Sequence, residues 1–419
     1  MPCETPLKRA LTMKGQGGKM LTEIQTERYA DVLLWGLFKA RSTEFKKNDI
    51  VLIRYNQPAL KLCEIVYEKL LKLGLNPIQR VGLTPYMEKQ FYMLSDEEQL
   101  VFIPPGEEVL YNHLNGSIYL HAPESITHLS EVNPSKIGKT AVSFKPLRDI
   151  LNKREDNGDF SWTLCSYPTE EPAKHARLTP EDYAKQIIKA CFLNRKNPVE
   201  IWEDIFTKAA AIKAWLNSMN IKEYHVESQS MDLYISQGEK RKWIGISGHN
   251  IPSFELFLSP DWRGVKGVYY SNLPTYRSGN YVEGVRIEFI DGVAVNVTAD
   301  TGESFVQSQL KMDDGASKVG EFSLTDKRFS KIDQFMANTL YDENFGGKHG
   351  NCHIALGASY SDTYDGDPRA LDKELKKKLG FNDSALHWDL VNTESKKVTA
   401  LLAGGGKELI YENGRFLFD

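Results

Sequence analysis

The hydrophobic pattern of this 419-residue chain changes near residue 196, and that change constrains its fold more than any other feature. Before it, strand-like and helix-like segments alternate. The β-branched run DIVLIRYN (49–56) precedes PALKLCEIVYEKLLKLG, whose apolar residues repeat at helical spacing, and the strand-like NPIQRVG follows. A strand, a helix and a strand in this order predict a βαβ unit.

The same alternation continues to about residue 195. Further strand-like runs are QLVFIP (99–104), GSIYLHA (116–122), KTAVSF (139–144) and FSWTLCSYP (160–168). TPEDYAKQIIKACFL predicts a helix, with Thr179 as its cap and Pro180 at its first position. We therefore expect residues 20–195 to form an α/β domain with a mostly parallel, doubly wound sheet. Residues 1–19 lack the apolar core of a secretory signal and are expected to be a disordered extension.

Short strands and tight turns follow the helical segment 199–219. The strand-like runs are DLYISQG, KWIGISG, GVRIEFIDGVAVNV and LIYENGRFLFD. The last two contain Asp291-Gly292 and Asn413-Gly414, which are typical of two-residue hairpin turns. These patterns predict a second, α+β domain over residues 196–419 with largely antiparallel strands. Two domains are also the expectation for a chain of this length.

Composition excludes several classes of function. Fifty-two basic against 56 acidic residues give a net charge of −4, and without a basic block nucleic acid is not an expected partner. The five cysteines lack CxxC spacing, which favours reduced thiols in a cytoplasmic protein. The chain has no run of about 18 apolar residues, so no membrane span is predicted. No GxGxxG follows a strand, so the predicted sheet alone does not imply a nucleotide.

Candidate functional residues are scattered over the second half, because no HExxH, GxSxG or paired CxxC motif is present. Carboxylates and imidazoles with apolar neighbours are Glu255 in NIPSFELFLSP, Glu321 in KVGEFSL, His353 in HIALG, and His387 and Asp389 in LHWDL. A solvent-facing glutamate or a hydrogen-bonded core histidine is the structural alternative for each. The HxD pair is more informative, since alternate residues of a strand share one face.

Together these side chains suit hard or borderline divalent ions. Zinc, cobalt and manganese accept mixed oxygen and nitrogen ligands, whereas calcium prefers oxygen alone. Spacing over such distances does not by itself show that the residues meet. His349 is expected in a loop. The remaining histidines have no acidic, apolar-flanked context and are not candidates: His113, His121, His128, His175, His225 and His249.

The segment NIPSFELFLSP resembles the Asn-x-Pro-Ser/Thr-Glu-Glu-x-Phe-Thr-x-Pro signature of the aminopeptidase T, aminopeptidase S and PepS family of dimetal exopeptidases. The similarity continues in order through YVEGVRIEFIDG, DDGASKVGEFSL, TLYDEN, HIALGASY and LHWDL. It covers the second half well, whereas the first half matches mainly in architecture and in SWTLCSYPT.

The resemblance implies a metal-dependent aminopeptidase that acts on short peptides with a free N-terminus. It implies two divalent ions (zinc, cobalt, manganese or magnesium) per subunit of a homodimer, whose first domains help to enclose a cavity. Glu321 is the implied bridge between the ions and a proton acceptor, and Tyr360 the implied catalytic tyrosine. The full set of implied metal ligands is Glu255, Glu321, Glu343, His353, His387 and Asp389, with Glu343 either a ligand or a nearby carboxylate.

The chain departs from the family pattern in two places. Phe254 replaces the first glutamate of the signature, and Leu258 replaces the following threonine. The stretch between DEN and His353 is longer by a few residues and brings in His349 and Cys352. A binding protein that has lost turnover and a dimetal hydrolase of another amide or ester are the alternative functions. The native metal and the preferred N-terminal residue are not predicted from the sequence.

Overall fold

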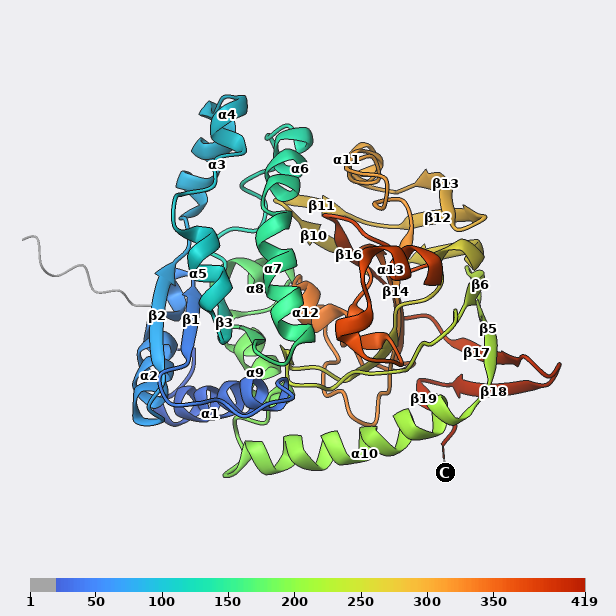
Figure 1. Ribbon diagram of the computed structural model, residues 1–419, viewed down its shortest axis with the longest axis horizontal. Helices are drawn as coiled ribbons and strands as arrows, with labels where there is room; N and C mark the ends of the chain where they lie inside the picture. The colour runs from blue at the N-terminus through green and yellow to red at the C-terminus, as the bar shows by residue number, and fades with distance from the viewer. Residues whose placement is uncertain (1–19, 419) are drawn as a thin grey trace, which may run out of the picture.

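The computed structural model describes residues 20–418, so the predicted extension 1–19 lies outside the described residues (Figure 1). The first half is organised around a five-stranded parallel sheet with the order β2-β1-β3-β4-β7. Its strands are β1 (Ile50–Tyr55), β2 (Asn76–Val81), β3 (Gly116–His121), β4 (Ser161–Ser166) and β7 (Asn250–Ile251). The predicted βαβ unit is present, with α2 (Leu60–Lys72) as its crossover helix.

Helices cover the two faces of this sheet unequally. On one face, Val51, Ile53, Ile118 and Leu120 are buried in the main hydrophobic core, which also contains residues of α1 (Glu23–Lys39) and α2. On the other face, α5 (Glu107–His113) and α7 (Lys145–Asp156) pack only over the amino-terminal part of the strands, around Leu52. Towards their carboxyl ends, the strands on that face carry polar and aromatic side chains.

Two of the strands predicted for the first half are wrong. Residues 99–104 end the short helix α4 (Glu97–Leu100) and continue irregularly, and residues 139–144 lie mainly in α6 (Pro134–Ser143). Both segments are apolar enough for strands, but capping decides otherwise. Asp96 forms a capping box at α4, and Asn133 caps α6 ahead of Pro134.

The segment KWIGISG is also not a regular strand. Ile244 forms only an isolated bridge to Phe257. Gly245 and Ile246 both have positive φ, of 122° and 51°, which interrupts an extended ladder. A Cβ at position 245 would lie 2.1 Å from the carbonyl oxygen of Glu255, so only glycine allows this close approach.

The second half contains an eight-stranded antiparallel sheet with the order β13-β12-β9-β6-β5-β17-β18-β19. The hairpins predicted at Asp291-Gly292 and Asn413-Gly414 are confirmed, and all four residues have the positive φ that such turns require. The strands are β5 (Ile221–Ser228), β6 (Asp232–Ser236), β9 (Lys266–Ser271), β12 (Val285–Ile290), β13 (Val293–Thr298), β17 (Lys396–Leu402), β18 (Lys407–Glu412) and β19 (Arg415–Phe416).

A smaller antiparallel sheet lies inside the second half, with the order β16-β15-β14-β8. Every residue of its two central strands is buried. Its strands are β8 (Glu255–Leu258), β14 (Val319–Thr325), β15 (Asn351–Gly357) and β16 (His387–Asn392). A parallel first half with helices and an antiparallel second half confirm the expected fold class.

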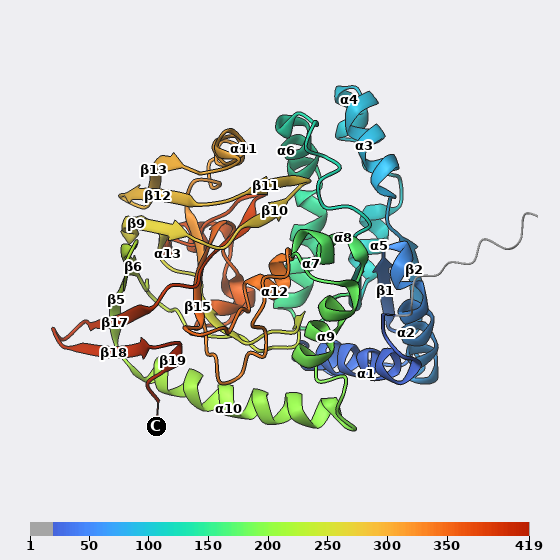
Figure 2. The ribbon, with the colours of Figure 1, turned by 180° about the vertical axis from the view of Figure 1, so that it is seen from behind.

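One helix, α10 (Pro198–Ser218), runs beneath both halves and lies beside α1 at one end (Figures 1 and 2). The expected domain boundary at residues 195 and 196 falls between α9 (Pro180–Ala190) and α10, and stays a prediction. None of the helices within residues 20–418 has the length and apolar character needed to cross a membrane.

The other helices and strands are mostly short. The remaining α-helices are α3 (Pro85–Leu94), α8 (Glu170–His175), α11 (Glu303–Gln309), α12 (Thr339–Asp342) and α13 (Lys373–Leu379). The remaining strands are β10 (Thr275–Arg277) and β11 (Asn280–Val282), and the 3-10 helices are η2 (Gln57–Ala59), η3 (Trp262–Gly264), η4 (Ser361–Thr363) and η5 (Pro368–Ala370).

Candidate metal centre

The small antiparallel sheet brings the five scattered candidates of the second half to one face. Paired residues of antiparallel strands share a face, and so do alternate residues of one strand. Ser323 of β14 pairs with His353 of β15, Thr325 with Glu255, and Ala355 with Asp389. By this register Glu321 and His387 also lie on the face of His353.

The ligand-type atoms of this face are close together. His353 Nε2 lies 3.1 Å from Glu321 Oε1, 3.2 Å from Glu255 Oε2 and 3.9 Å from Asp389 Oδ1. His387 Nε2 lies 3.7 Å from Glu321 Oε2 and 3.5 Å from Asp389 Oδ1. Glu321 therefore directs one carboxylate oxygen towards each imidazole.

Burial makes this arrangement electrostatically demanding. Glu255, Glu321 and His353 are only 5%, 3% and 1% exposed. Burial raises the pKa of Glu255; His353 opposes that rise, and the negative charge of Glu321 adds to it. For His353, burial favours the neutral ring, but the hydrogen bond to Glu321 and the charge of Glu255 outweigh it and raise the pKa to about 9.

The donor set fits a divalent cation. One ligand atom each from Glu255, Glu321 and His353 lies within 4.8 Å of the other two. Carboxylate oxygens with imidazole nitrogens are the mixture that zinc, cobalt and manganese accept. A cation would also offset the cost of gathering several carboxylates away from water.

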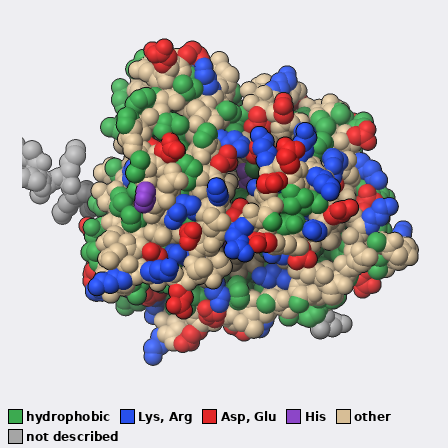
Figure 3. All heavy atoms as spheres, in the orientation of Figure 1, with side chains coloured by type: hydrophobic (Ala, Val, Ile, Leu, Met, Phe, Trp, Pro, Cys, Tyr) green, Lys and Arg blue, Asp and Glu red, His purple; other side chains and the backbone are tan. Residues whose placement is uncertain are grey.

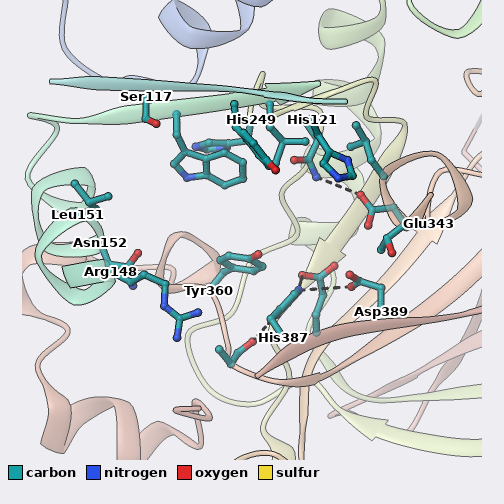
Figure 4. Close-up of a pocket in the computed structure, with 18 of the residues that line it drawn as sticks. Ser117, His121, Arg148, Leu151, Asn152, His249, Glu343, Tyr360, His387 and Asp389 are labelled. Carbon is teal, nitrogen blue, oxygen red and sulfur yellow. Dashed lines mark hydrogen bonds and ion pairs between the residues drawn. The ribbon is translucent and has the colours of Figure 1, made fainter. Parts of the chain in front are cut away.

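Glu343 joins the site from a different direction. It caps the carboxyl end of α12, and its Oε1 accepts hydrogen bonds from Asn250 Nδ2 at 3.2 Å and Asn344 Nδ2 at 3.4 Å. Its pKa is raised well above the usual range by burial and by the charges of Glu255 and Asp389. Asn250 belongs to β7, so a strand of the parallel sheet orients a carboxylate at the candidate metal centre. Figure 4 shows Glu343 near Asp389.

Tyr360 follows β15 and faces the same space. Its ring lies 4.8 Å from the His387 ring and 5.9 Å from the Phe257 ring, and its backbone N–H donates to Ser259 Oγ. Desolvation, reinforced by the charge of Glu321, raises the pKa of Tyr360 well above its usual value. The phenol therefore keeps its proton and is available as a hydrogen-bond donor.

A cavity of about 800 Å³ extends from this cluster between the two halves of the molecule. Its lining includes Ser117, His121 and Trp162 from the parallel sheet, together with Tyr360, His387 and Asp389. Figure 3 shows a hollow near the centre of the view, surrounded by acidic and basic side chains. The first half thus contributes a wall to the candidate site.

The cavity lining also includes His121 and His249, whose neighbouring residues did not mark them as candidates in the sequence. His249 Nε2 lies 2.7 Å from a Glu155 carboxylate oxygen, but the two residues are 94 positions apart. His121 lies at the carboxyl end of β3, and burial lowers its pKa to about 4, so its ring is neutral. The position of His121 was the available signal, because α/β sheets bind ligands at the carboxyl ends of their parallel strands.

The two side chains that differ from the family signature, Phe254 and Leu258, point away from the candidate metal ligands. The Phe254 ring stacks on Trp202 at 5.3 Å, and both Phe254 and Leu258 are fully buried in the hydrophobic core. Cys352 lies on the opposite face of β15 from His353, and its thiol pKa is raised to about 11 by burial. His349 occupies a turn outside the cavity lining, as expected for a loop residue.

Comparisons with known proteins identify the family of the chain. The chain is 26% identical to aminopeptidase PepS of Streptococcus thermophilus over 366 residues, which cover 83% of each protein. It is 27% identical to aminopeptidase T of Thermus aquaticus over 311 residues, covering 69% of this chain and 73% of that protein. The fold is similar to that of wild-type AmpT from Thermus thermophilus, with a TM-score of 0.75, 22% identity, and coverage of 94% and 99%. The model of the thermophilic metalloprotease family M29 matches residues 22–416, and the chain therefore belongs to this family.

Proposed function

We propose that this protein is a metal-dependent aminopeptidase that removes the N-terminal residue from short peptides. The observation that carries the proposal is the position of Glu321, whose two carboxylate oxygens face the imidazoles of His353 and His387. Two of its relatives are named as aminopeptidases, PepS of Streptococcus thermophilus and aminopeptidase T of Thermus aquaticus, which supports the same activity here.

The proposed ligands would hold two divalent ions, of zinc, cobalt, manganese or magnesium. Glu321, which faces both imidazoles, would be the carboxylate that both ions share, because a paired site needs such a group. Glu343, held by Asn250 and Asn344, is a further ligand or a carboxylate close to the ions. The other assigned ligands are Glu255, His353, His387 and Asp389. Bound divalent ions supply Lewis acidity, which polarises the scissile carbonyl and acidifies the attacking water.

The protein's own side chains complete the chemistry. The Glu321 carboxylate accepts the proton of the attacking water and returns it to the leaving amine. The Tyr360 hydroxyl donates a hydrogen bond to the oxygen of the carbonyl as negative charge develops on it, so the contact is strongest in the transition state. The walls of the cavity limit access of bulk water and favour short or unfolded substrates over folded proteins.

The expected homodimer has a candidate interface on the first half. The edge strand β2 is exposed along most of its length, and α3 buries none of its residues. We propose that a second copy of this chain covers the exposed apolar side chains of this edge, which are Ile78, Val81, Leu83, Tyr86, Met87, Met93 and Leu94. An unpaired, apolar sheet edge favours association with another chain. Light scattering of wild type and Leu94→Glu tests this: a wild-type monomer would contradict it.

We also propose a cytoplasmic location. The four described cysteines, Cys63, Cys165, Cys191 and Cys352, are all free thiols and buried, as expected in a reducing compartment. Cell fractionation tests the location, and recovery of the protein outside the cytoplasm would contradict it.

The activity is tested on protein stripped with a chelator and reloaded separately with each of the four metals. We expect hydrolysis of leucine-, phenylalanine- or arginine-p-nitroanilide, and no cleavage of the matching N-acetylated peptides. Two bound ions without cleavage of any peptide would favour a binding protein. Cleavage of blocked and free peptides at equal rates would favour a hydrolase of another amide or ester.

A further inference from the structure

A second charged feature of the cavity is the arginine on α7. Arg148 reaches from this helix to the loop that precedes β16, where Nη1 and Nη2 each lie 3.3 Å from the carbonyl oxygen of Ala385. Arg148 lines the same cavity as Tyr360 and His387. In Figure 4 it lies on the opposite side of Tyr360 from Asp389 and Glu343.

The positive charge of Arg148 has no carboxylate partner within residues 20–418. Its hydrogen bonds there go only to backbone carbonyls, at 3.3 Å to Ala385 and 3.5 Å to Ala141. The acids nearby have other partners, since Lys145 binds both Asp149 and Asp383 at 3.0 Å. A planar guanidinium with unused donors is suited to bind a carboxylate through two parallel hydrogen bonds.

The wall around Arg148 contains charges of both signs, because Asp149, Glu155 and Asp383 also line the cavity. Those carboxylates are paired with Lys145 or His249, whereas Arg148 has no counter-ion among residues 20–418. The candidate metal centre, with its carboxylates and the proposed ions, lies on the other side of Tyr360. A short peptide at neutral pH has the complementary pattern, with an ammonium group at one end and a carboxylate at the other. Arg148 supplies the group that the carboxylate end would need, and Asn152, one helical turn later, also lines the cavity.

The chain geometry places an upper bound on the separation between Arg148 and the candidate metal centre. Ala385 precedes His387 by two residues, so their Cα atoms are within about 7 Å of each other. Because the guanidinium contacts Ala385, it cannot lie far from the candidate metal centre. An extended dipeptide or tripeptide has a backbone length of about 7–10 Å, which is the same scale.

We propose that Arg148 binds the free C-terminal carboxylate of dipeptide and tripeptide substrates while the N-terminal residue occupies the metal centre. This inference rests on the proposed aminopeptidase activity and adds a requirement at the other end of the substrate. Arg148 is then a specificity-determining residue. It explains a preference for short peptides by recognition of their terminus as well as by the size of the cavity.

Another cavity arginine offers a matched control. Arg54 on β1 also lines the cavity and forms no ion pair with the described residues, but its guanidinium lies 5.3 Å from the centre of the Tyr119 ring. It belongs to β1 of the parallel sheet, and among residues 20–418 no hydrogen bond or ion pair joins it to the loop before β16. The two arginines have the same charge in the same cavity and differ in position.

The test compares Leu-Gly-Gly with its C-terminal amide, using leucine-p-nitroanilide as a substrate that lacks the carboxylate. For the metal-loaded wild type we expect kcat/KM to be about 10- to 100-fold higher for the free acid than for the amide. In Arg148→Met this ratio falls to near 1, mainly through KM. Arg148→Lys keeps an intermediate ratio, because the charge remains but the fork is lost. Arg54→Met keeps the wild-type ratio.

Three results would overturn the inference. One is equal cleavage of acid and amide by the wild type, and another is a ratio that depends on Arg54 instead of Arg148. The third is a loss in Arg148→Met that is equally large for leucine-p-nitroanilide, which would mean that Arg148 only supports the loop at Ala385. If the wild type cleaves leucine-p-nitroanilide but does not prefer free Leu-Gly-Gly over its amide, only the proposed role of Arg148 is refuted. One that cleaves none of the three substrates refutes the aminopeptidase.

Discussion

Replacing Tyr360 by phenylalanine is expected to separate the contribution of this residue to catalysis from its contribution to stability. The ring of Tyr360 packs against the His387 and Phe257 rings, and its backbone is held by Ser259 and Thr363. Its hydroxyl makes no hydrogen bond with any residue in the range 20–418. Phenylalanine preserves the ring and backbone contacts and removes only the hydroxyl.

The expected magnitude follows from this difference. Removing one donor to a developing oxyanion typically costs about 2.7–4 kcal/mol of transition-state stabilisation, so kcat should fall about 10²- to 10³-fold. The free energy of unfolding should change by no more than about 0.5 kcal/mol, because no buried partner loses its bond. The metal content should stay at the wild-type value, since Tyr360 is not among the proposed ligands.

Three measurements on the same preparation decide the matter. Steady-state hydrolysis of leucine-p-nitroanilide gives kcat and KM, thermal unfolding gives the stability, and elemental analysis gives the metal content. A kcat within about threefold of wild type would refute the donor role of Tyr360. A large loss of activity together with lower metal content would instead mean that the phenol supports the ion site.

Glu321→Gln and His353→Ala should each abolish hydrolysis and reduce bound metal while circular dichroism shows a folded protein; normal turnover in either, with metal controlled, would contradict the ligand assignment. His349→Ala should leave kcat/KM nearly unchanged, since this residue lies outside the cavity lining; a large loss would place its loop at the site. Phe254→Ala should destabilise the protein by about 3–5 kcal/mol in denaturant unfolding, because it empties a buried position next to Trp202. Chelation should lower the free energy of unfolding, and a metal at 100 times its Kd should restore about 2.7 kcal/mol for each ion bound; an unchanged Tm in calorimetric scans with and without metal would contradict this.

Local sequence signals predicted the elements whose structure depends on neighbouring residues. The hairpins at Asp291-Gly292 and Asn413-Gly414 form because their turn residues adopt positive φ readily. The segments 99–104 and 139–144 were harder, because strand-like composition competed with caps at Asp96 and Asn133. In both, the caps and the helical context outweighed β propensity.

The candidate site depends in part on contacts that cannot be predicted from the sequence. Alternation within β16 places His387 and Asp389 on one face, and the sequence alone carries that information. The pairing of Glu155 with His249, and the reach of Arg148 to Ala385, depend on how the two halves pack. Contacts of this kind join positions 94 and 237 residues apart and leave no periodic trace in the sequence.

The two-residue strand β7 limits how the protein can admit its substrate. Ile251 is hydrogen-bonded into the parallel sheet beside Cys165 of β4. Only four residues later, Glu255 starts β8 of the smaller antiparallel sheet, which carries the candidate metal ligands. Any rotation that spread the halves apart would pull on the carboxylate of Glu255 through this short connection. A wide, jaw-like opening would therefore disturb a proposed metal ligand, and we expect peptides to enter and leave by side-chain and loop movements at the rim of the cavity.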